Sequence, residues 1–340
     1  MSPIAVSNNQ RILSGMRPTG ALHLGHYHGV LKNWLHLQHS YRCFFFVADW
    51  HALTTHYEDP RLIGESLWDM IIDWLAVGID PSVATLFIQS RVPEHAELHL
   101  LLSMITPISW LERVPSYKDQ QERLKSLDLA TYGFLGYPLL QSADILIYRA
   151  TQVPVGDDQV AHVELTREVA RRFNRLYAKG DGAFVLPEPA ALLTHASKMP
   201  GLDGQKMSKS YGNTIALCEP PASVEKKLRT MPTDPARVRR SDPGDPGKCP
   251  VWQFHQIYST EDTRTWVQQG CRTAGIGCIE CKKPVIDAVL AETALFRTRA
   301  QSYREQMGWV RNLIEEGCAT AQQVARETLN EVRQAMGIHG

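Results

Sequence analysis

The strongest constraint on the fold is the apolar run CFFFVA at residues 43–48, which contains no charged or strongly polar residue. A strand with one solvated face alternates apolar and polar residues, whereas a strand buried on both faces is apolar throughout. TLFI at 85–88 is a second such run, and RILS at 11–14 is typical of a shorter strand. Strands of this kind occur in parallel sheets that helices cover on both sides.

Helical periodicity fills the gaps between these strands, over about 23–38 and 60–77. The resulting strand–helix order predicts an α/β fold, a doubly wound Rossmann-type parallel sheet with right-handed crossovers. Ligands of such sheets bind beyond the carboxyl ends of the strands. Asp49 and His51 directly follow the second strand and Gln89 follows the third, so we expect all three at that edge.

The chain of 340 residues is long enough for about two domains. The strand pattern fades after about residue 215, which predicts a second, all-helical domain. A Pro-, Gly- and Asp-rich tract at 233–250 indicates an ordered loop between helices, and 321–336 is typical of an amphipathic helix. The apolar runs are too short to cross a bilayer, so no membrane partner is expected.

Composition excludes a generally basic protein, because Lys+Arg and Asp+Glu are both 36. A nucleic-acid partner would therefore need a local basic patch, for which Arg237, Arg239 and Arg240 are candidates. The N-terminus lacks the charged and apolar regions of a signal peptide, which predicts a cytoplasmic protein. Its seven cysteines are then expected to be reduced.

The segment TGALHLGHYHG places His23 and His26 one helical turn apart, just after the first strand. The free N–H groups at the start of a helix suit a phosphate, and imidazoles can donate hydrogen bonds to phosphate oxygens. Gly25 would leave bare backbone against which a base or sugar could lie. A metal site is disfavoured because two histidines are too few ligands. Two histidines on a solvated helix face are the plain alternative.

The segment QKMSKS at 205–210 is a second candidate phosphate site. Lys206 and Lys209 are mobile point charges, which suit a polyphosphate that has to leave. Glycines at 201, 204 and 212 would allow the loop to open and close. Taken alone, a pair of lysines is more often part of a solvated basic loop.

Together, HLGH and KMSKS resemble the two signature motifs of class I aminoacyl-tRNA synthetases. The segments SGMRPTGALHLGHYHG, VADWHALT, AVGIDPSVATLFIQSRVPEHAEL, YPLLQSADILIY and VPVGDDQVAHVELTREVARRFN are similar to bacterial tryptophanyl-tRNA synthetase. The resemblance implies a homodimeric ligase that activates L-tryptophan with Mg²⁺ and ATP and transfers it to tRNA-Trp. It implies a catalytic domain at 1–215, a helical anticodon-binding domain at 216–305, and a C-terminal helix at 306–340 that packs back towards the catalytic domain.

The indole N–H is the only polar group of the tryptophan side chain, so a selective pocket needs one acceptor in an apolar slot. Asp144 is a lone carboxylate amid apolar residues in YPLLQSADILI, and the resemblance assigns it to the indole nitrogen. Loss of such a partner costs about 1–3 kcal/mol or more, which penalises apolar competitors. The other tryptophan-binding residues that the resemblance implies are Tyr137, Gln141, Gln159, His51, Val153 and Val155.

The resemblance also supplies an ATP site. Its expected members are Arg17, Pro18, Thr19, Gly25, His26, Gly156, Asp157, Asp158, Lys198, Met199, Lys206, Met207, Ser208, Lys209 and Ser210. In the expected mechanism, the tryptophan carboxylate attacks the α-phosphorus in line, and His23, His26 and the two lysines stabilise the departing pyrophosphate. No covalent catalyst is expected.

Three alternatives from other classes stay open on the residues alone. A nucleotidylyltransferase would share the H-x-G-H turn but would not need an indole acceptor or a helical half. A tyrosine-specific enzyme would need partners for a phenol. A tryptophan sensor without catalysis would be expected to have lost a motif lysine or histidine, and all four are present.

Four cysteines, Cys249, Cys271, Cys278 and Cys281, lie in one segment with 21, 6 and 2 residues between them. Such a set in a reducing compartment indicates a metal site, and four thiolates suit zinc or an iron–sulfur cluster. The order resembles a subset of bacterial tryptophanyl-tRNA synthetases with a 4Fe–4S cluster, which makes the cluster the prediction and Zn²⁺ its alternative. Because the set is far from HLGH and KMSKS in sequence, a structural or tRNA-positioning role is expected.

Overall fold

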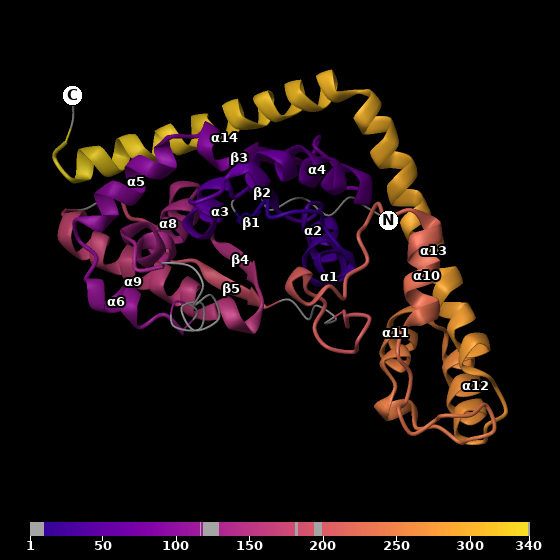
Figure 1. Cartoon of the computed structure of the whole chain (residues 1–340). Helices are drawn as coiled ribbons and strands as arrows, with labels where there is room; N and C mark the ends of the chain where they lie inside the picture. The colour runs from indigo at the N-terminus through magenta and orange to yellow at the C-terminus, as the bar shows by residue number, and fades with distance from the viewer. Residues whose placement is uncertain (1–9, 116, 118–128, 181–182, 194–198, 339–340) are drawn as a thin grey trace.

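The computed structural model describes residues 10–115, 117, 129–180, 183–193 and 199–338. Five parallel strands form one sheet in the order β3-β2-β1-β4-β5. Their bounds are β1 Arg11–Met16, β2 Arg42–Val47, β3 Ala84–Ile88, β4 Gln152–Val155 and β5 Ala190–Leu193. The first strand, β1, lies in the middle of the sheet and the later strands are added on both sides of it, which confirms the predicted doubly wound fold (Figure 1).

The apolar run that predicted a doubly covered strand is β2. Phe44 and Phe45 point to opposite faces of the sheet, and both are fully buried. Phe45 stacks on Trp34 with ring centroids 4.1 Å apart, and Phe44 stacks on Tyr148 at 4.9 Å. The strand therefore has no solvated face, for the reason that its sequence indicated.

The predicted helix over 23–38 is interrupted. It consists of α1 Leu24–His26, a π-helical turn Tyr27–Leu31 and α2 Lys32–Leu37. In the π turn, His28 is buried and its Nε2 lies 2.8 Å from the hydroxyl of Tyr258, far along the chain. The periodicity of the apolar residues gave no signal for this turn, which serves a tertiary contact.

Further helices complete the sheet-containing part of the chain. Their bounds are α3 Asp49–His56, α4 Arg61–Val77, α5 Glu94–Ser103, α6 Ile108–Glu112, α8 Tyr132–Ile147 and α9 Val160–Tyr177. Short 3-10 turns cover Gln89–Arg91, Asp157–Gln159 and Lys209–Tyr211. Helix α4 matches the helix predicted over 60–77, with Pro60 just before its first residue.

The C-terminal part forms a helical arm, as the loss of strand pattern predicted (Figure 1). It contains α10 Pro221–Thr230, α11 Pro250–Tyr258, α12 Glu261–Arg272 and α13 Cys278–Glu305. The loop at 233–250 is ordered by Asp234, which accepts the backbone N–H groups of Ala236 and Asp245. Helix α13 also packs on α4, and this contact joins the arm to the first part.

The last helix, α14 Met307–Ala335, runs back across the first part, beside β3 and α5 (Figure 1). A Cβ atom added to Gly317 would overlap the carbonyl oxygen of Leu86, so only glycine allows α14 to lie this close to β3. The helix is longer than the predicted 321–336. None of the helices in the described ranges is long and apolar enough to span a membrane.

Candidate active site

The HLGH segment lies beyond the carboxyl end of β1, at the edge where a doubly wound sheet binds ligands. His23 precedes α1 in extended conformation, and its backbone N–H donates to Nδ1 of His26 at 3.2 Å. The two rings lie against each other with centroids 3.8 Å apart. Nδ1 of His23 is buried and has no hydrogen-bond partner within the described part of the chain.

KMSKS closes directly onto HLGH. The backbone N–H of Gly25 donates to the sulfur of Met207 at 3.3 Å, and Nζ of Lys209 donates to the carbonyl of Thr19 at 2.8 Å. A Cβ on Gly25 would lie 2.9 Å from the His23 ring and 3.2 Å from Cβ of Met207. Gly25 therefore permits the contact with Met207. We expected the space beside Gly25 to be open for the nucleotide, but Met207 occupies it.

Positive and protonatable groups gather at the HLGH–KMSKS contact. Burial lowers the pKa of His23 to about 4, and the charge of Lys209 adds to the shift. Burial, then His23 and the two KMSKS lysines, hold the pKa of His26 well below its usual range. Burial also lowers the pKa of Lys209 to about 8; Asp73 opposes this shift and Arg17 adds to it. Such mutual repulsion is relieved by a polyanion.

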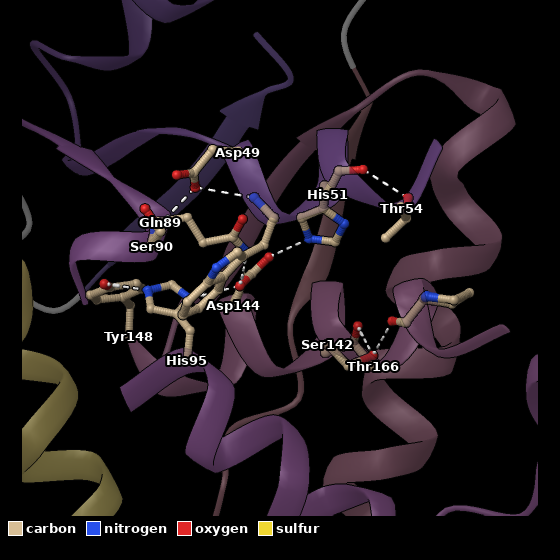
Figure 2. Close-up of polar contacts among 12 residues, drawn as sticks. Asp49, His51, Thr54, Gln89, Ser90, His95, Ser142, Asp144, Tyr148 and Thr166 are labelled. Carbon is tan, nitrogen blue, oxygen red and sulfur yellow. Dashed lines mark hydrogen bonds and ion pairs between the residues drawn. The ribbon is translucent and has the colours of Figure 1, made fainter. Parts of the chain in front are cut away.

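Asp144 is the centre of a second group of side chains at the same edge (Figure 2). It lies on α8 with 1% of its surface exposed. Its Oδ1 accepts from Nε2 of Gln89 at 2.8 Å and from Nδ1 of His95 at 2.6 Å. Its Oδ2 accepts from Nε2 of His51 at 2.7 Å. On the far side of His95, Nε2 lies 2.7 Å from the hydroxyl of Tyr148.

These contacts keep Asp144 charged. Burial by itself would raise the pKa of Asp144, but the charge and hydrogen bond of His51, followed by the hydrogen bond from His95, hold it well below its usual range. An ionised carboxylate has about four acceptor positions. Three are filled by Gln89, His95 and His51, so one position, on Oδ2, is left for a further donor.

The structure brings some of the other expected tryptophan-binding residues near Asp144. Tyr137 and Gln141 precede it by seven and three residues on α8, so the three share one helix face. The ring of Tyr137 lies 5.6 Å from that of His162 on α9. Val153 and Val155 are buried in β4, while Gln159 ends the exposed 3-10 turn beyond that strand.

The expected ATP site is only partly described. Gly156 and Asp157 lie at the carboxyl end of β4, Pro18 and Met199 are buried, and Ser208 and Ser210 share a hydrogen bond of 2.9 Å. Lys198 and the side chain of Asp158 fall outside the described residues. Much of the surface of Arg17 is exposed, but desolvation of its guanidinium lowers its pKa, and the nearby Tyr137 opposes this shift.

The four clustered cysteines come together in the arm. Burial, and then the neighbouring thiols of Cys249, Cys271 and Cys278, raise the pKa of Cys281 to about 12. Nη1 of Arg237 lies 3.9 Å from the sulfur of Cys271. Within the described residues, no group of three or more His, Cys, Asp or Glu side chains is arranged to hold a metal ion.

Arg237 has a different place from the one that its basic neighbours suggested. It is buried, and its Nη2 donates to the carbonyls of Ile276 at 2.6 Å and Arg240 at 3.0 Å. Those contacts bind the loop to the turn before α13, so Arg237 is not available to a tRNA. Arg239 and Arg240 are exposed.

Sequence reasoning missed His95 and Tyr148. Tyr148 follows Asp144 by four residues, which is one helical turn. No pattern in the sequence linked His95 to Asp144 or to Tyr148. His95 reaches Asp144 because α5 packs against α8.

A parallel sheet with HLGH and KMSKS in contact beyond β1 is the arrangement of a class I aminoacyl-tRNA synthetase. The family model for tRNA synthetases class I (W and Y) matches residues 7–292, and the chain belongs to this family.

Among its relatives, the Tryptophan–tRNA ligase of Ralstonia nicotianae is 60% identical, with 97% of this chain and 98% of the relative covered. The Tryptophan–tRNA ligase of Thermotoga maritima is 52% identical, with 96% and 99% covered. A crystal structure of tryptophanyl-tRNA synthetase from Campylobacter jejuni, complexed with ADP and tryptophan, superimposes with a TM-score of 0.86 at 30% identity. It covers 96% of this chain and 100% of that one.

Proposed function

We propose that the residues at the carboxyl edge of the sheet bind tryptophan and ATP and join them as tryptophanyl-adenylate. The chain is a tryptophan–tRNA ligase, an aminoacyl-tRNA synthetase, like relatives that match it over nearly their whole length. The adenylate is then captured by the 3′-terminal ribose of tRNA-Trp. The observation that carries the assignment of residues is the buried, ionised Asp144 with one acceptor position left.

That remaining position matches the chemistry of indole. The indole N–H is a donor only, and an ionised carboxylate is an acceptor only, so the pair is complementary. A phenol could also donate, but its oxygen is an acceptor as well, and the three donors around Asp144 are already used. Tyr137, Gln141, Gln159 and His51 would hold the remainder of the amino acid, with Val153 and Val155 behind the ring.

The HLGH–KMSKS contact suits the activation step. The tryptophan carboxylate forms a bond to the α-phosphorus of ATP while the bond to pyrophosphate breaks, so negative charge grows on the leaving group. His23, His26, Lys206 and Lys209 are grouped where they can stabilise this charge. ATP enters as its Mg²⁺ complex, which supplies further neutralisation of the phosphates. The ribose would lie by Gly156, Asp157 and Asp158, and the adenine by Lys198 and Met199.

Alanine substitution at each lysine separates this role from amino-acid binding. In ATP–pyrophosphate exchange, Lys206→Ala or Lys209→Ala should lower kcat at least about tenfold and change the KM for tryptophan little, because the charge develops in the transition state. Lys283→Ala is the control, since Lys283 is exposed on α13 and pairs with Asp287 at 3.2 Å. Unchanged kcat with weaker tryptophan binding would contradict the assignment. Exchange measured with each of the twenty amino acids tests the substrate.

For the four cysteines we propose a 4Fe–4S cluster held by Cys249, Cys271, Cys278 and Cys281. Support comes from the three thiols that lie near Cys281 and from the donor groups beside them, while the four sulfurs, which all belong to the described residues, are not arranged as metal ligands in this structure. Nη1 of Arg237 faces Cys271, and Nε2 of His255 lies 3.5 Å from the sulfur of Cys281. Hydrogen bonds and cations beside thiolates stabilise their charge. The cluster would cross-link α11, α12 and α13 and so stiffen the arm.

The metal content decides between the cluster and zinc. Protein purified without oxygen should be brown and contain about four irons per chain. A colourless protein with one zinc per chain would contradict the cluster and favour Zn²⁺, and the proposed ligase activity would still stand. Cys218→Ser should keep the same metal content, because Cys218 lies outside the group and donates to Asp73.

The arm of α10–α13 is proposed as the anticodon-binding domain at 216–305, with residues 1–215 catalytic and 306–340 a helix that packs back. The exposed Arg239 and Arg240 support a tRNA contact at the loop before α11. The homodimer remains a prediction from the resemblance, and the cytoplasmic location remains a prediction from the N-terminal sequence.

A further inference from the structure

A fully buried chain of hydrogen bonds lies behind the Asp144 carboxylate (Figure 2). The hydroxyl of Tyr148 lies 2.7 Å from Nε2 of His95, and Nδ1 of His95 lies 2.6 Å from Oδ1 of Asp144. Tyr148 and His95 are 0% exposed. None of these contacts reaches solvent, so the phenol hydroxyl, the imidazole and Oδ1 have only one another and Gln89 as hydrogen-bond partners within the described residues.

The direction of donation follows from the groups at the two ends of the chain. Burial, and then the charges of Asp144, Cys318 and Glu94, raise the pKa of Tyr148 well above its usual range, so Tyr148 is a neutral phenol. An ionised carboxylate can only accept, so Nδ1 of His95 carries a proton toward Asp144, and Nε2 of the neutral imidazole accepts the O–H of Tyr148. A neutral imidazole that accepts at Nε2 carries its proton on Nδ1, and this is the atom that faces Asp144.

The surroundings leave this chain little freedom. The ring of Tyr148 packs on Phe44 at 4.9 Å and on Phe87 at 5.3 Å, and the ring of His95 lies 6.0 Å from Phe87. Gln89 donates to the same oxygen, Oδ1, as His95 does. Oδ1 is therefore filled by two protein donors, and only Oδ2 can receive the indole.

We propose that His95 and Tyr148 are positioning residues for tryptophan recognition. Tyr148 fixes the tautomer of His95, and His95 holds Asp144 so that Oδ2 faces the amino-acid side chain. This inference rests on the proposed role of Asp144 as the indole acceptor. His95 and Tyr148 do not touch the substrate, and they determine specificity through their effect on Asp144.

Tyr148→Phe tests the first link, because it keeps the stacked ring and removes only the hydroxyl. We expect the KM for tryptophan to rise about five- to twentyfold in ATP–pyrophosphate exchange, with the KM for ATP and kcat within about twofold. Preference for tryptophan over an analogue with sulfur in place of the indole N–H should fall about tenfold. Tyr303→Phe is the control, since Tyr303 stacks on Trp309 at 5.8 Å on the arm side.

The second link is tested with a side chain that has no tautomers. In His95→Asn, the amide N–H occupies about the place of Nδ1–H and can still donate to Asp144. Removal of the Tyr148 hydroxyl in this background should change the KM for tryptophan less than about twofold. An equal rise of KM in both backgrounds would show that Tyr148 does not act through His95 and would overturn the proposal.

Two comparisons distinguish failure of this positioning role from failure of the Asp144 assignment. If Asp144→Asn loses the preference over the sulfur analogue and Tyr148→Phe retains it, the positioning role is wrong and the role of Asp144 stands. If Asp144→Asn keeps the preference, the indole assignment itself fails. Thermal unfolding of each variant identifies any that has lost its fold. If His95→Asn has lost its fold, the analogue preference of Tyr148→Phe decides whether the positioning role is correct.

Discussion

Replacement of Asp144 by asparagine should separate tryptophan binding from every other property of the enzyme. Two donors, Gln89 and His95, require an oxygen at the Oδ1 position. The NH₂ group of the introduced amide is therefore forced to the Oδ2 position, where His51 now donates. His51 can change its tautomer and accept from the introduced NH₂ group. The indole N–H can only donate, so it would face the NH₂ group without an acceptor.

The expected loss follows from that one contact. A hydrogen bond to a charged group contributes about 1.5–3 kcal/mol, and each 1.4 kcal/mol is a factor of ten. We therefore expect kcat/KM for tryptophan to fall about 10- to 100-fold in Asp144→Asn, mostly through KM, with the KM for ATP unchanged. Asp144→Ala should nearly abolish exchange and cost about 3–5 kcal/mol of stability, because it leaves three buried donors unpaired.

ATP–pyrophosphate exchange at varied tryptophan measures the first effect, and guanidinium unfolding measures the second. Asp80→Asn is a suitable control, since Asp80 accepts from Ser82 in the turn before β3. Wild-type exchange by Asp144→Ala would refute the indole role. A rise in the KM for ATP as large as that for tryptophan would show instead that the site as a whole had been distorted.

Three further results are expected. The pKa of Lys209 is lowered to about 8, so its charge is lost as the pH rises through 8. In steady-state pH profiles, kcat/KM for ATP should therefore fall above that pH in the wild type and persist to higher pH in Lys209→Arg. Gly25→Ala should lower kcat at least about tenfold, because its Cβ would crowd the neighbouring histidine ring and the KMSKS methionine, whereas Gly29→Ala, with open space at its Cβ, should exchange normally. Gly317→Ala should lower the free energy of unfolding by about 1–3 kcal/mol, while Gly308→Ala on the same helix meets nothing and should leave it unchanged or raise it by up to about 1 kcal/mol in denaturant titrations.

The sequence alone determined the sheet and the two phosphate motifs. Continuous apolar runs identified β2 and β3 because a strand buried on both faces cannot carry polar residues. The position of HLGH after β1 followed from the same strand order. Asp144 could be selected because a single carboxylate within an apolar segment needs a buried partner.

Tertiary structure decided what surrounds those residues. His95 reaches Asp144 through the packing of α5 on α8, and Met207 fills the space beside Gly25 because KMSKS folds back over a distance of about 180 residues. Arg237 looked like part of a tRNA contact, but it is buried, because the carbonyls of its loop and of the turn before α13 need donors. Each of these depends on contacts between segments far apart in the chain, and local periodicity carries no information about such contacts.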